Sequence, residues 1–469
     1  MTEQDALKTA LQARLDQQKQ AFKQDPMPSA AARKQHLKAL RQALLAHQQP
    51  LIEAISADFS HRAADETRMA ELLPCLLNID YTLKHLERWL KPSKRKVALA
   101  FQPASAQVVY QPVGVVGIIV PWNYPLFLAI GPLIGALAAG NRAMLKLSEA
   151  TPNTSALIKQ LLKSVFTDDH VSVVLGDVDT AIAFSELAFD HLLFTGSSHV
   201  GRQVMHAAAA NLTPVTLELG GKSPAIIGQD AEMLATCERI AFGKTLNAGQ
   251  TCVAPDYVLV PHARLEEFVD TYSQVVRRFY PSLVDNPDYT AIINTRQLQR
   301  LEDYLTDAKA HGARILSLYP QGQGRRMPHA LVLDVNEHMR LMQEEIFGPL
   351  LPVVPYQSLD QALDYVQSRP RPLALYYFGH TPDEQARVLS HTHSGGVCIN
   401  DALLHVAQED LPFGGIGASG MGAYHGHEGF LTFSHAKAVF SKGRFNAARL
   451  IYPPYGGLVQ RLVQKFLLR

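Results

Sequence analysis

Residues 112–141 read PVGVVGIIVPWNYPLFLAIGPLIGALAAGN and contain no charged residue. A stretch this long and apolar could cross a membrane as a single helix. Three prolines inside it and the polar pair Trp122-Asn123 would disrupt such a helix, whereas prolines commonly separate short apolar runs. The stretch therefore favours a buried strand over 115–120, a turn, and then a buried helix.

Short apolar runs separated by helical stretches continue along most of the chain. This alternation is typical of parallel sheets with helices on both faces, and it predicts an α/β fold. Before residue 91 the apolar positions recur at helical spacing and predict helices alone. The predicted strands are 115–120, 143–147, 171–175 and 191–195 in a first doubly wound layer, and 224–227, 257–260, 331–335, 350–354, 373–378 and 396–399 in a second.

The composition limits the kinds of molecule that the protein is expected to bind. The chain has 469 residues, a formal charge of +1 and four scattered cysteines. Its length predicts two large domains, and the balanced charge argues against a nucleic-acid partner. The cysteine spacing predicts neither disulfides nor a metal site. Because the N-terminus also lacks the apolar stretch of a secretory signal, we expect a cytoplasmic protein that binds a small molecule.

Two reactive side chains lie near the boundary between the two predicted layers. Cys252 ends the run Gly-Gln-Thr-Cys, and Glu218 opens Glu-Leu-Gly-Gly. A thiolate can attack a carbonyl carbon and hold the product as a thioester, and a carboxylate can activate the water that releases it. A lone cysteine is more often a small buried apolar residue, and a lone glutamate is more often a solvated surface charge. Their glycine-containing neighbours and interdomain position favour a catalytic pair.

Two glycine patterns could bind a dinucleotide. Residues 415–420 match Gly-x-Gly-x-x-Gly literally, but more glycine follows, so the strand-to-helix context of that motif is missing. Gly196, Ser197 and Gly201 leave a predicted strand and enter a predicted helix, whose N-terminus favours a diphosphate. Ser197 could equally be an ordinary helix N-cap. The residues alone leave both roles open.

Five motifs, taken in order, resemble the aldehyde dehydrogenase family from about residue 30 to 440. They are Pro121-Trp-Asn123, the Gly196-to-Gly201 turn, Glu218-Leu-Gly-Gly, Gly-Gln-Thr-Cys252 and the run Glu-Glu-Ile-Phe-Gly-Pro at 344–349. Residues 369–376 and Tyr424-His-Gly are similar to the class 3 branch and its bacterial relatives. The resemblance implies two Rossmann-like doubly wound α/β domains and a small oligomerisation element.

The resemblance also implies domain limits and an assembly. The NAD-binding domain would comprise residues 1–105 and 118–220, and the catalytic domain residues 221–420. Residues 106–117 and 421–469 would form the oligomerisation element and the C-terminal tail. A homodimer is expected.

Roles are implied for the motif residues as well. The catalytic set is Cys252 as nucleophile, Glu218 as the water-activating base, and Asn123, which shares an oxyanion hole with the Cys252 backbone N–H. The implied cofactor contacts are Lys146, Glu149, Gly196, Ser197, Gly201, Glu345 and Phe347. NAD is the expected cofactor because the Glu149 carboxylate would repel the 2′-phosphate of NADP, although class 3 relatives use both. A surface i,i+3 ion pair is the alternative for Lys146 and Glu149.

The implied reaction is oxidation of a hydrophobic or aromatic aldehyde, such as coniferyl aldehyde, to its acid through a cysteine thiohemiacetal and thioester. Acyl transfer to coenzyme A is an alternative, but it needs no water-activating base, so Glu218 argues against it. A cofactor-binding structural protein is a third reading. Tyr124, Leu126 and Phe127 suit an aromatic substrate, although core packing explains them equally well.

The C-terminal tail predicts an amphipathic helix. One helical face carries the apolar residues Leu458, Val459, Leu462, Val463, Phe466 and Leu467, and basic residues including Arg469 lie elsewhere. The segment is too short to cross a bilayer. Docking on the protein's own surface or on a partner subunit is favoured over weak binding to a membrane surface.

Overall fold

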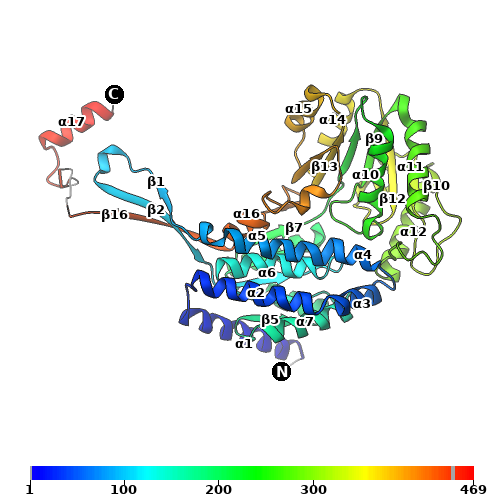
Figure 1. Cartoon of the computed structure of the whole chain (residues 1–469). Helices are drawn as coiled ribbons and strands as arrows, with labels where there is room; N and C mark the ends of the chain where they lie inside the picture. The colour runs from blue at the N-terminus through cyan, green and yellow to red at the C-terminus, as the bar shows by residue number, and fades with distance from the viewer. Residues whose placement is uncertain (1–2, 445–448, 451, 469) are drawn as a thin grey trace.

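The computed structural model describes residues 3–444, 449–450 and 452–468. Within these residues the strands form a six-stranded sheet, a seven-stranded sheet and a three-stranded sheet. Helices cover the two large sheets, and the three-stranded sheet projects from the body (Figure 1). The predicted α/β class with two doubly wound layers and a third, smaller element is confirmed.

The segment from residue 3 to 89 is helical, as its apolar spacing predicts. Buried leucines on α2 face the first domain, and Ser29 caps this helix by accepting a hydrogen bond from the Ala32 N–H. A π-helical turn at Arg68–Leu72 interrupts the helix that follows. The helices are α1 (Glu3–Gln24), α2 (Ala30–Ala46), α3 (Gln48–Asp58), α4 (Ala64–Thr67) and α5 (Leu73–Trp89).

The first large sheet has the strand order β15-β7-β6-β3-β4-β5 and is parallel except for β15. Its strands are β3 (Val115–Ile119), β4 (Arg142–Lys146), β5 (Val171–Val174), β6 (His191–Thr195), β7 (Val215–Glu218) and β15 (Gly420–Met421). Its helices are α6 (Phe127–Ala139), α7 (Pro152–Val165), α8 (Val178–Ser185) and α9 (Ser198–Ala209). The charge-free stretch thus forms strand, turn and buried helix, as predicted. Among the described residues, no helix is both long and apolar enough to cross a membrane.

The Gly-x-Gly-x-x-Gly run at 415–420 lies in a tight turn that ends in β15. Gly420 pairs with Glu218 of β7, and its φ of 140° together with the close Leu217 carbonyl leaves no room for a side chain. Gly420 therefore lets β15 and β7 approach each other. The run opens no helix, in agreement with the context argument.

The second large sheet has the order β10-β11-β12-β9-β8-β13-β14. Its strands are β8 (Pro224–Ile227), β9 (Tyr257–Pro261), β10 (Arg314–Ser317), β11 (Ala330–Leu333), β12 (Leu350–Tyr356), β13 (Ala374–Phe378) and β14 (Gly396–Ile399). Its helices are α10 (Met233–Thr245), α11 (Leu265–Phe279), α12 (Thr295–Ala310), α13 (Arg340–Gln343), α14 (Leu359–Gln367) and α15 (Pro382–His391). In this second sheet, the strand that was not predicted is the antiparallel edge strand β10, because its short sequence lacks a continuous apolar run.

The third sheet combines segments from distant parts of the chain. Strand β16 (Ser434–Lys442) pairs antiparallel with the whole of β2 (Ala104–Pro112), and β1 (Ser93–Arg95) adds the other edge. Before it, α16 (Gly426–Thr432) packs on α5 and α6 of the first domain. The projecting sheet is the candidate for the predicted assembly element, and the homodimer stays a prediction.

The predicted tail helix is present as α17 (Leu458–Leu467), at the far end of the projecting sheet (Figure 1). Its apolar side chains face solvent, with Leu458 79% and Phe466 75% exposed. The Leu467 side chain and Arg469 lie outside the described residues. Because this face is not buried on the described part of the chain, docking on the protein's own surface is not observed. Contact with a partner subunit or a membrane stays a prediction.

Candidate active site

Cys252 follows a tight turn that the sequence builds for close approach. The turn Leu246–Gly249 contains two left-handed non-glycine residues, Asn247 and Ala248, each with φ 52°. Gly249 comes next because a Cβ there would lie 2.5 Å from the Gly348 carbonyl oxygen. Cys252 itself is half-buried and free. Such backbone strain persists only where the surroundings hold it in place, and it concentrates at functional sites.

Gln250 is the residue that holds this turn. Its amide donates to the Asn247 and Ala291 carbonyls over 2.9 and 3.1 Å, and its side-chain oxygen accepts from the Ile293 N–H over 2.9 Å. All of these groups are buried. The glutamine of Gly-Gln-Thr-Cys therefore fixes the backbone before the nucleophile.

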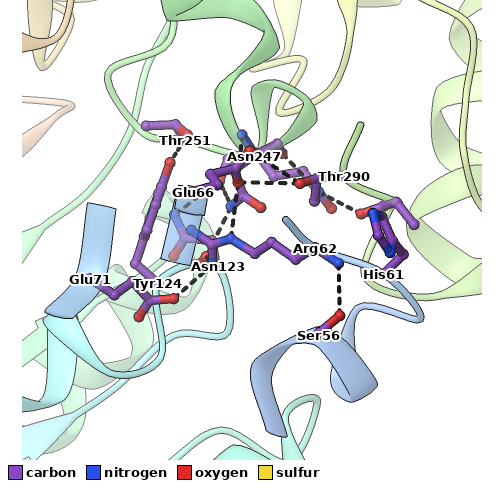
Figure 2. Close-up of polar contacts among 12 residues, drawn as sticks. Ser56, His61, Arg62, Glu66, Glu71, Asn123, Tyr124, Asn247, Thr251 and Thr290 are labelled. Carbon is purple, nitrogen blue, oxygen red and sulfur yellow. Dashed lines mark hydrogen bonds and ion pairs between the residues drawn. The ribbon is translucent and has the colours of Figure 1, made fainter. Parts of the chain in front are cut away.

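Asn123 lies against the same turn. It follows β3 in the stretch before α6, is 3% exposed, and donates from Nδ2 to the Gln250 carbonyl oxygen over 3.1 Å. A carboxamide has two N–H donors, so the second can face a ligand. Next to it, the Tyr124 hydroxyl lies 2.7 Å from Thr251 Oγ1. The first-domain turn and the Cys252 loop are thus joined directly (Figure 2).

Glu218 ends β7, and the residue is 3% exposed. Neither carboxylate oxygen has a hydrogen-bond partner among the described residues. Burial raises the pKa of this carboxyl well above its usual value. Because buried polar groups are nearly always bonded, an unpartnered carboxyl group calls for a ligand or a water molecule.

A stability measurement can test this burial. Since the folded-state pKa of Glu218 exceeds its unfolded value, stability decreases as pH rises from about 4.5 through the folded pKa. We expect Glu218→Gln to melt higher than the wild type by at least about 2 °C at pH 8, with a smaller difference at pH 5. Thermal unfolding at both pH values measures it. The exposed Glu302→Gln should show no such pH-dependent difference, and an equal gap at both pH values for Glu218→Gln would contradict the expectation.

The thiol of Cys252 is disfavoured as an anion by its surroundings. Burial raises its pKa to about 12, and the charges of Glu345 and Glu218 add to the effect. Hydrogen bonds from the Cys252 and Val253 N–H groups oppose it. A nearby positive charge or a proton acceptor would therefore be needed to form the thiolate.

The Gly196–Gly201 turn joins β6 to α9. The Ser197 hydroxyl caps α9 by accepting from the Val200 N–H over 3.4 Å. The Gly196 N–H donates to the Glu218 carbonyl oxygen over 3.0 Å, and a Cβ on Gly201 would meet the Leu219 side chain at 2.7 Å. The N-cap reading is thus observed, and the diphosphate role stays a prediction.

A groove of about 950 Å³ opens beside this turn. It is lined by Ile119 of β3, Phe194 of β6 and residues of α8 and α9, including the exposed Val178 and Ile182. The strand order reverses between β3 and β6, and ligands of doubly wound sheets bind at that switch point. The exposed apolar lining suits a flat aromatic ring.

Lys146 and Glu149 follow β4, the neighbour of β3. Lys146 is 2% exposed, and its Nζ donates to the Leu147 carbonyl over 2.8 Å and to Glu149 over 3.2 Å. The Glu149 side chain is about half exposed, at 49%. The alternative ion pair is therefore present, but its lysine is buried and only the carboxylate reaches the surface.

The second domain places Glu345 and Phe347 against turns of the first domain. Burial raises the pKa of Glu345 to about 8, with help from Asp256, while the Gly221 N–H lowers it. A Cβ on Gly220 would overlap the Glu345 carboxylate, so only glycine permits this approach. The Phe347 ring packs edge-on against Trp122 at 5.4 Å. Both residues thus touch first-domain turns next to Glu218 and Asn123.

A buried cluster of aromatic side chains packs at the N-terminal end of α6. His425 stacks on Phe413 at 4.9 Å and meets Phe127 edge-on at 6.0 Å. Both His425 ring nitrogens and the Tyr424 hydroxyl are buried without a described partner, and burial lowers the pKa of His425 to about 4. In this region, the family resemblance rests only on the sequence Tyr424-His-Gly. Within the described ranges, no group of three or more His, Cys, Asp or Glu residues is placed to hold a metal ion.

A free thiol that can carry an acyl group and a groove at the switch point of a nucleotide-type sheet together indicate a class of enzyme. These are oxidoreductases that act on carbonyl compounds with a dinucleotide. Residues 2–439 match the Aldehyde dehydrogenase family, and the chain belongs to that family.

Individual relatives cover nearly the whole chain. It is 64% identical over 98% of its length to the "Probable coniferyl aldehyde dehydrogenase" of Pseudomonas aeruginosa, of which 96% is covered. The solved "Substrate bound state of Staphylococcus Aureus AldH" has a TM-score of 0.92 and 38% identity, with 97% and 99% of the two chains covered. PnpE in complex with nicotinamide adenine dinucleotide has a TM-score of 0.85 and 25% identity, with 93% and 90% covered.

Proposed function

We propose that this aldehyde dehydrogenase oxidises a hydrophobic or aromatic aldehyde to the carboxylic acid with NAD, through a thiohemiacetal and a thioester on Cys252. The observation that carries the proposal is the junction of Cys252 and Asn123, made by the 3.1 Å hydrogen bond from the Asn123 amide to the Gln250 carbonyl. This bond holds an amide donor beside a half-buried thiol. A nucleophile and an oxyanion donor are the two groups that acyl chemistry requires first.

In the first step, the Cys252 thiol loses its proton to water and Sγ attacks the carbonyl carbon as the thiolate. The oxygen that becomes negative faces the second N–H of Asn123 and the Cys252 backbone N–H. One such donor is worth on the order of 3 kcal/mol of transition-state stabilisation. When bound, an oxidised nicotinamide supplies the hydride acceptor. Glu345 and Phe347 would orient that end, and the α9 N-terminus, Lys146 and Glu149 would hold the diphosphate and the adenosine ribose.

The groove between α8 and α9 would accept the adenine ring, because its lining is apolar and partly exposed. The PnpE complex with nicotinamide adenine dinucleotide, of similar fold, supports this choice of cofactor.

Hydrolysis then depends on Glu218. Its raised pKa and its two unpartnered oxygens suit a base that takes a proton from the attacking water. The acyl group leaves as a free acid, and the Cys252 thiol is regenerated.

The name of the Pseudomonas aeruginosa relative supports an aromatic aldehyde. Leu126 is fully buried and serves the core, and the Tyr124 hydroxyl bonds Thr251. A kcat/KM series over aliphatic, benzylic and cinnamyl aldehydes tests the proposal, with cinnamyl aldehydes expected to rank first. A clear preference for short aliphatic aldehydes would overturn the substrate class.

Cofactor preference should depend on Glu149. Its half-exposed carboxylate would lie near the 2′-phosphate of NADP and repel it. We expect Glu149→Gln to raise the ratio of kcat/KM with NADP to that with NAD by about tenfold, since one like-charge contact in partly solvated surroundings is worth on the order of 1 kcal/mol. Steady-state assays with both cofactors measure the ratio. Glu302→Gln is the charge-matched control, and an unchanged ratio in Glu149→Gln would contradict the assignment.

The tail and the projecting sheet support two proposals about partners. A homodimer would use the three-stranded sheet, and the exposed apolar face of α17 would contact a partner subunit or a membrane surface. Deleting residues 457–469 should leave co-sedimentation with anionic liposomes unchanged if the face belongs to a subunit contact. Loss of co-sedimentation on deletion would instead assign the face to the membrane.

A further inference from the structure

A buried ion triad lies directly behind the site. The Arg62 Nε donates to Glu66 over 3.0 Å, and its Nη1 donates to Glu71 over 2.7 Å. The side chains of Arg62 and Glu71 are 0% exposed and that of Glu66 is 7% exposed. Removing charges from water is costly even when they are paired, and burial raises the pKa of both carboxyls although Arg62 lowers it. The other contacts of the triad show how these buried groups are stabilised.

Glu71 ties the triad to the segment that follows Asn123. Its second oxygen accepts from the Leu126 and Phe127 N–H groups over 2.7 and 3.1 Å. These groups lie at the N-terminus of α6, where the helix dipole favours a negative charge. Glu71 comes from the π-helical turn Arg68–Leu72, a geometry often found at functional sites.

Glu66 ties the triad to the turn before Cys252. It accepts from the backbone N–H of Asn247 over 3.1 Å and from the Thr290 hydroxyl over 3.2 Å. Asn247 is left-handed, and its side-chain amide donates to the Asn123 carbonyl over 2.9 Å and to the Gln250 carbonyl over 3.2 Å. The Glu66 carboxylate thus braces the strained turn that carries the nucleophile.

Arg62 connects the segment around Asn123 to the turn before Cys252. Its Nη1 also approaches the Asn123 carbonyl oxygen at 3.4 Å, and its guanidinium lies 4.9 Å from the centre of the Tyr124 ring, whose hydroxyl reaches Thr251. Figure 2 shows the triad between the Asn123 segment on one side and Asn247 and Thr290 on the other. We propose that Arg62, Glu66 and Glu71 are positioning residues that hold the Asn123 amide in register with Cys252 and thereby set the rate of acylation.

This inference rests on the roles proposed for Cys252 and Asn123. Arg62→Lys keeps the positive charge but cannot bond both carboxylates in one plane. We expect it to lower the first-turnover rate of NADH formation by about 10- to 100-fold, because a small misplacement of a catalytic group has an effect of this size. The NAD dissociation constant should stay within about twofold, since the triad does not line the groove. Hydrolysis of an activated aryl ester, which needs Cys252 and the oxyanion donor but no cofactor, should fall in parallel.

A double-mutant cycle separates positioning from a general loss of packing. In an Asn123→Ala background, Arg62→Lys should lower acylation by less than about threefold, because the group that it positions is gone. The matched control is Arg33→Lys. Arg33 is 1% exposed and bonds the Ala138 and Ala139 carbonyls at the other end of α6, over 3.0 and 2.7 Å. Its effect should be the same in both backgrounds.

An Arg62→Lys effect of equal size with and without Asn123 would overturn the proposal, as would unchanged acylation in Arg62→Lys. If Arg62→Lys is not recovered folded, Thr290→Val removes a single donor to Glu66 and carries the same cycle, with an expected two- to fivefold effect that also vanishes without Asn123. Failure of the proposed function looks different, since turnover would then persist in Cys252→Ala whatever the triad does.

Discussion

Cys252→Ala will abolish aldehyde-dependent NADH formation, with kcat falling by at least about 10⁴-fold, the scale seen when a covalent nucleophile is removed. Nothing else in the site can form the thioester. Of the other cysteines, Cys75 and Cys237 are buried in the core. The purified variant should still melt as the wild type does and still bind NAD, because the thiol contributes little to either property.

Cys398→Ala is the matched control, since Cys398 is also half-buried and free but lies on the edge strand β14. It should keep kcat within about twofold, because it has no role in acyl transfer. Incubation with an aldehyde and NAD, followed by mass measurement, should show an acyl adduct only where Cys252 is present. Steady turnover in Cys252→Ala would refute the proposed chemistry.

Glu218→Gln will separate the two halves of the reaction. We expect the first turnover of NADH to stay within about threefold, while steady-state kcat falls by about 10²- to 10³-fold, since general bases contribute on that scale. The acyl-enzyme should accumulate, and added hydroxylamine, which needs no base to attack a thioester, should restore turnover. Stopped-flow absorbance at the NADH band gives both rates.

The pH profile provides a second readout of the same residue. Because Glu218 must be deprotonated to act and its pKa is raised by burial, kcat of the wild type should rise with pH through that pKa. This rise of kcat with pH should be absent in Glu218→Gln. Glu149→Gln, a carboxylate replacement outside the catalytic centre, should keep the rise. It should also keep the ratio of the first-turnover rate to the steady-state rate of NADH formation. Equal losses of acylation and deacylation in Glu218→Gln would assign Glu218 another role.

The sheets were predictable where the signal is local. A fully buried parallel strand reads as a continuous apolar run, and the predicted 191–195 coincides with β6. Strand β7 was missed although it carries Glu218. Its sequence, Val-Thr-Leu-Glu, is short and half polar, and it becomes a strand through pairing with β6 and with Gly420, far along the chain. The neighbouring strands that pair with such a segment cannot be predicted from its own sequence.

The motif residues of the site can be found from the order and sequence of the motifs. The residues that hold them in place cannot. Arg62 and Glu66 are spaced i,i+4 in a helical region, which usually indicates a solvated ion pair. Their burial follows from the packing of α4 and the π-helical turn against two loops from other parts of the chain. Likewise, the lack of a described hydrogen-bond partner for the Glu218 carboxylate depends on the folded structure around it. Long-range contacts decide both, and one sequence does not contain them.

The short strand β15 also sets the earliest time at which the sheet edge beside Glu218 can close during synthesis. Gly420 pairs with Glu218 itself, so the edge of the first sheet stays open until the chain has grown by roughly 200 residues beyond the base, or roughly 10 to 40 s at usual elongation rates. By then Cys252 and the second sheet have left the ribosome. The carboxylate that releases the product is thus enclosed after the thiol has emerged, and a nascent chain that already carries Cys252 lacks the enclosed base that would hydrolyse its thioester.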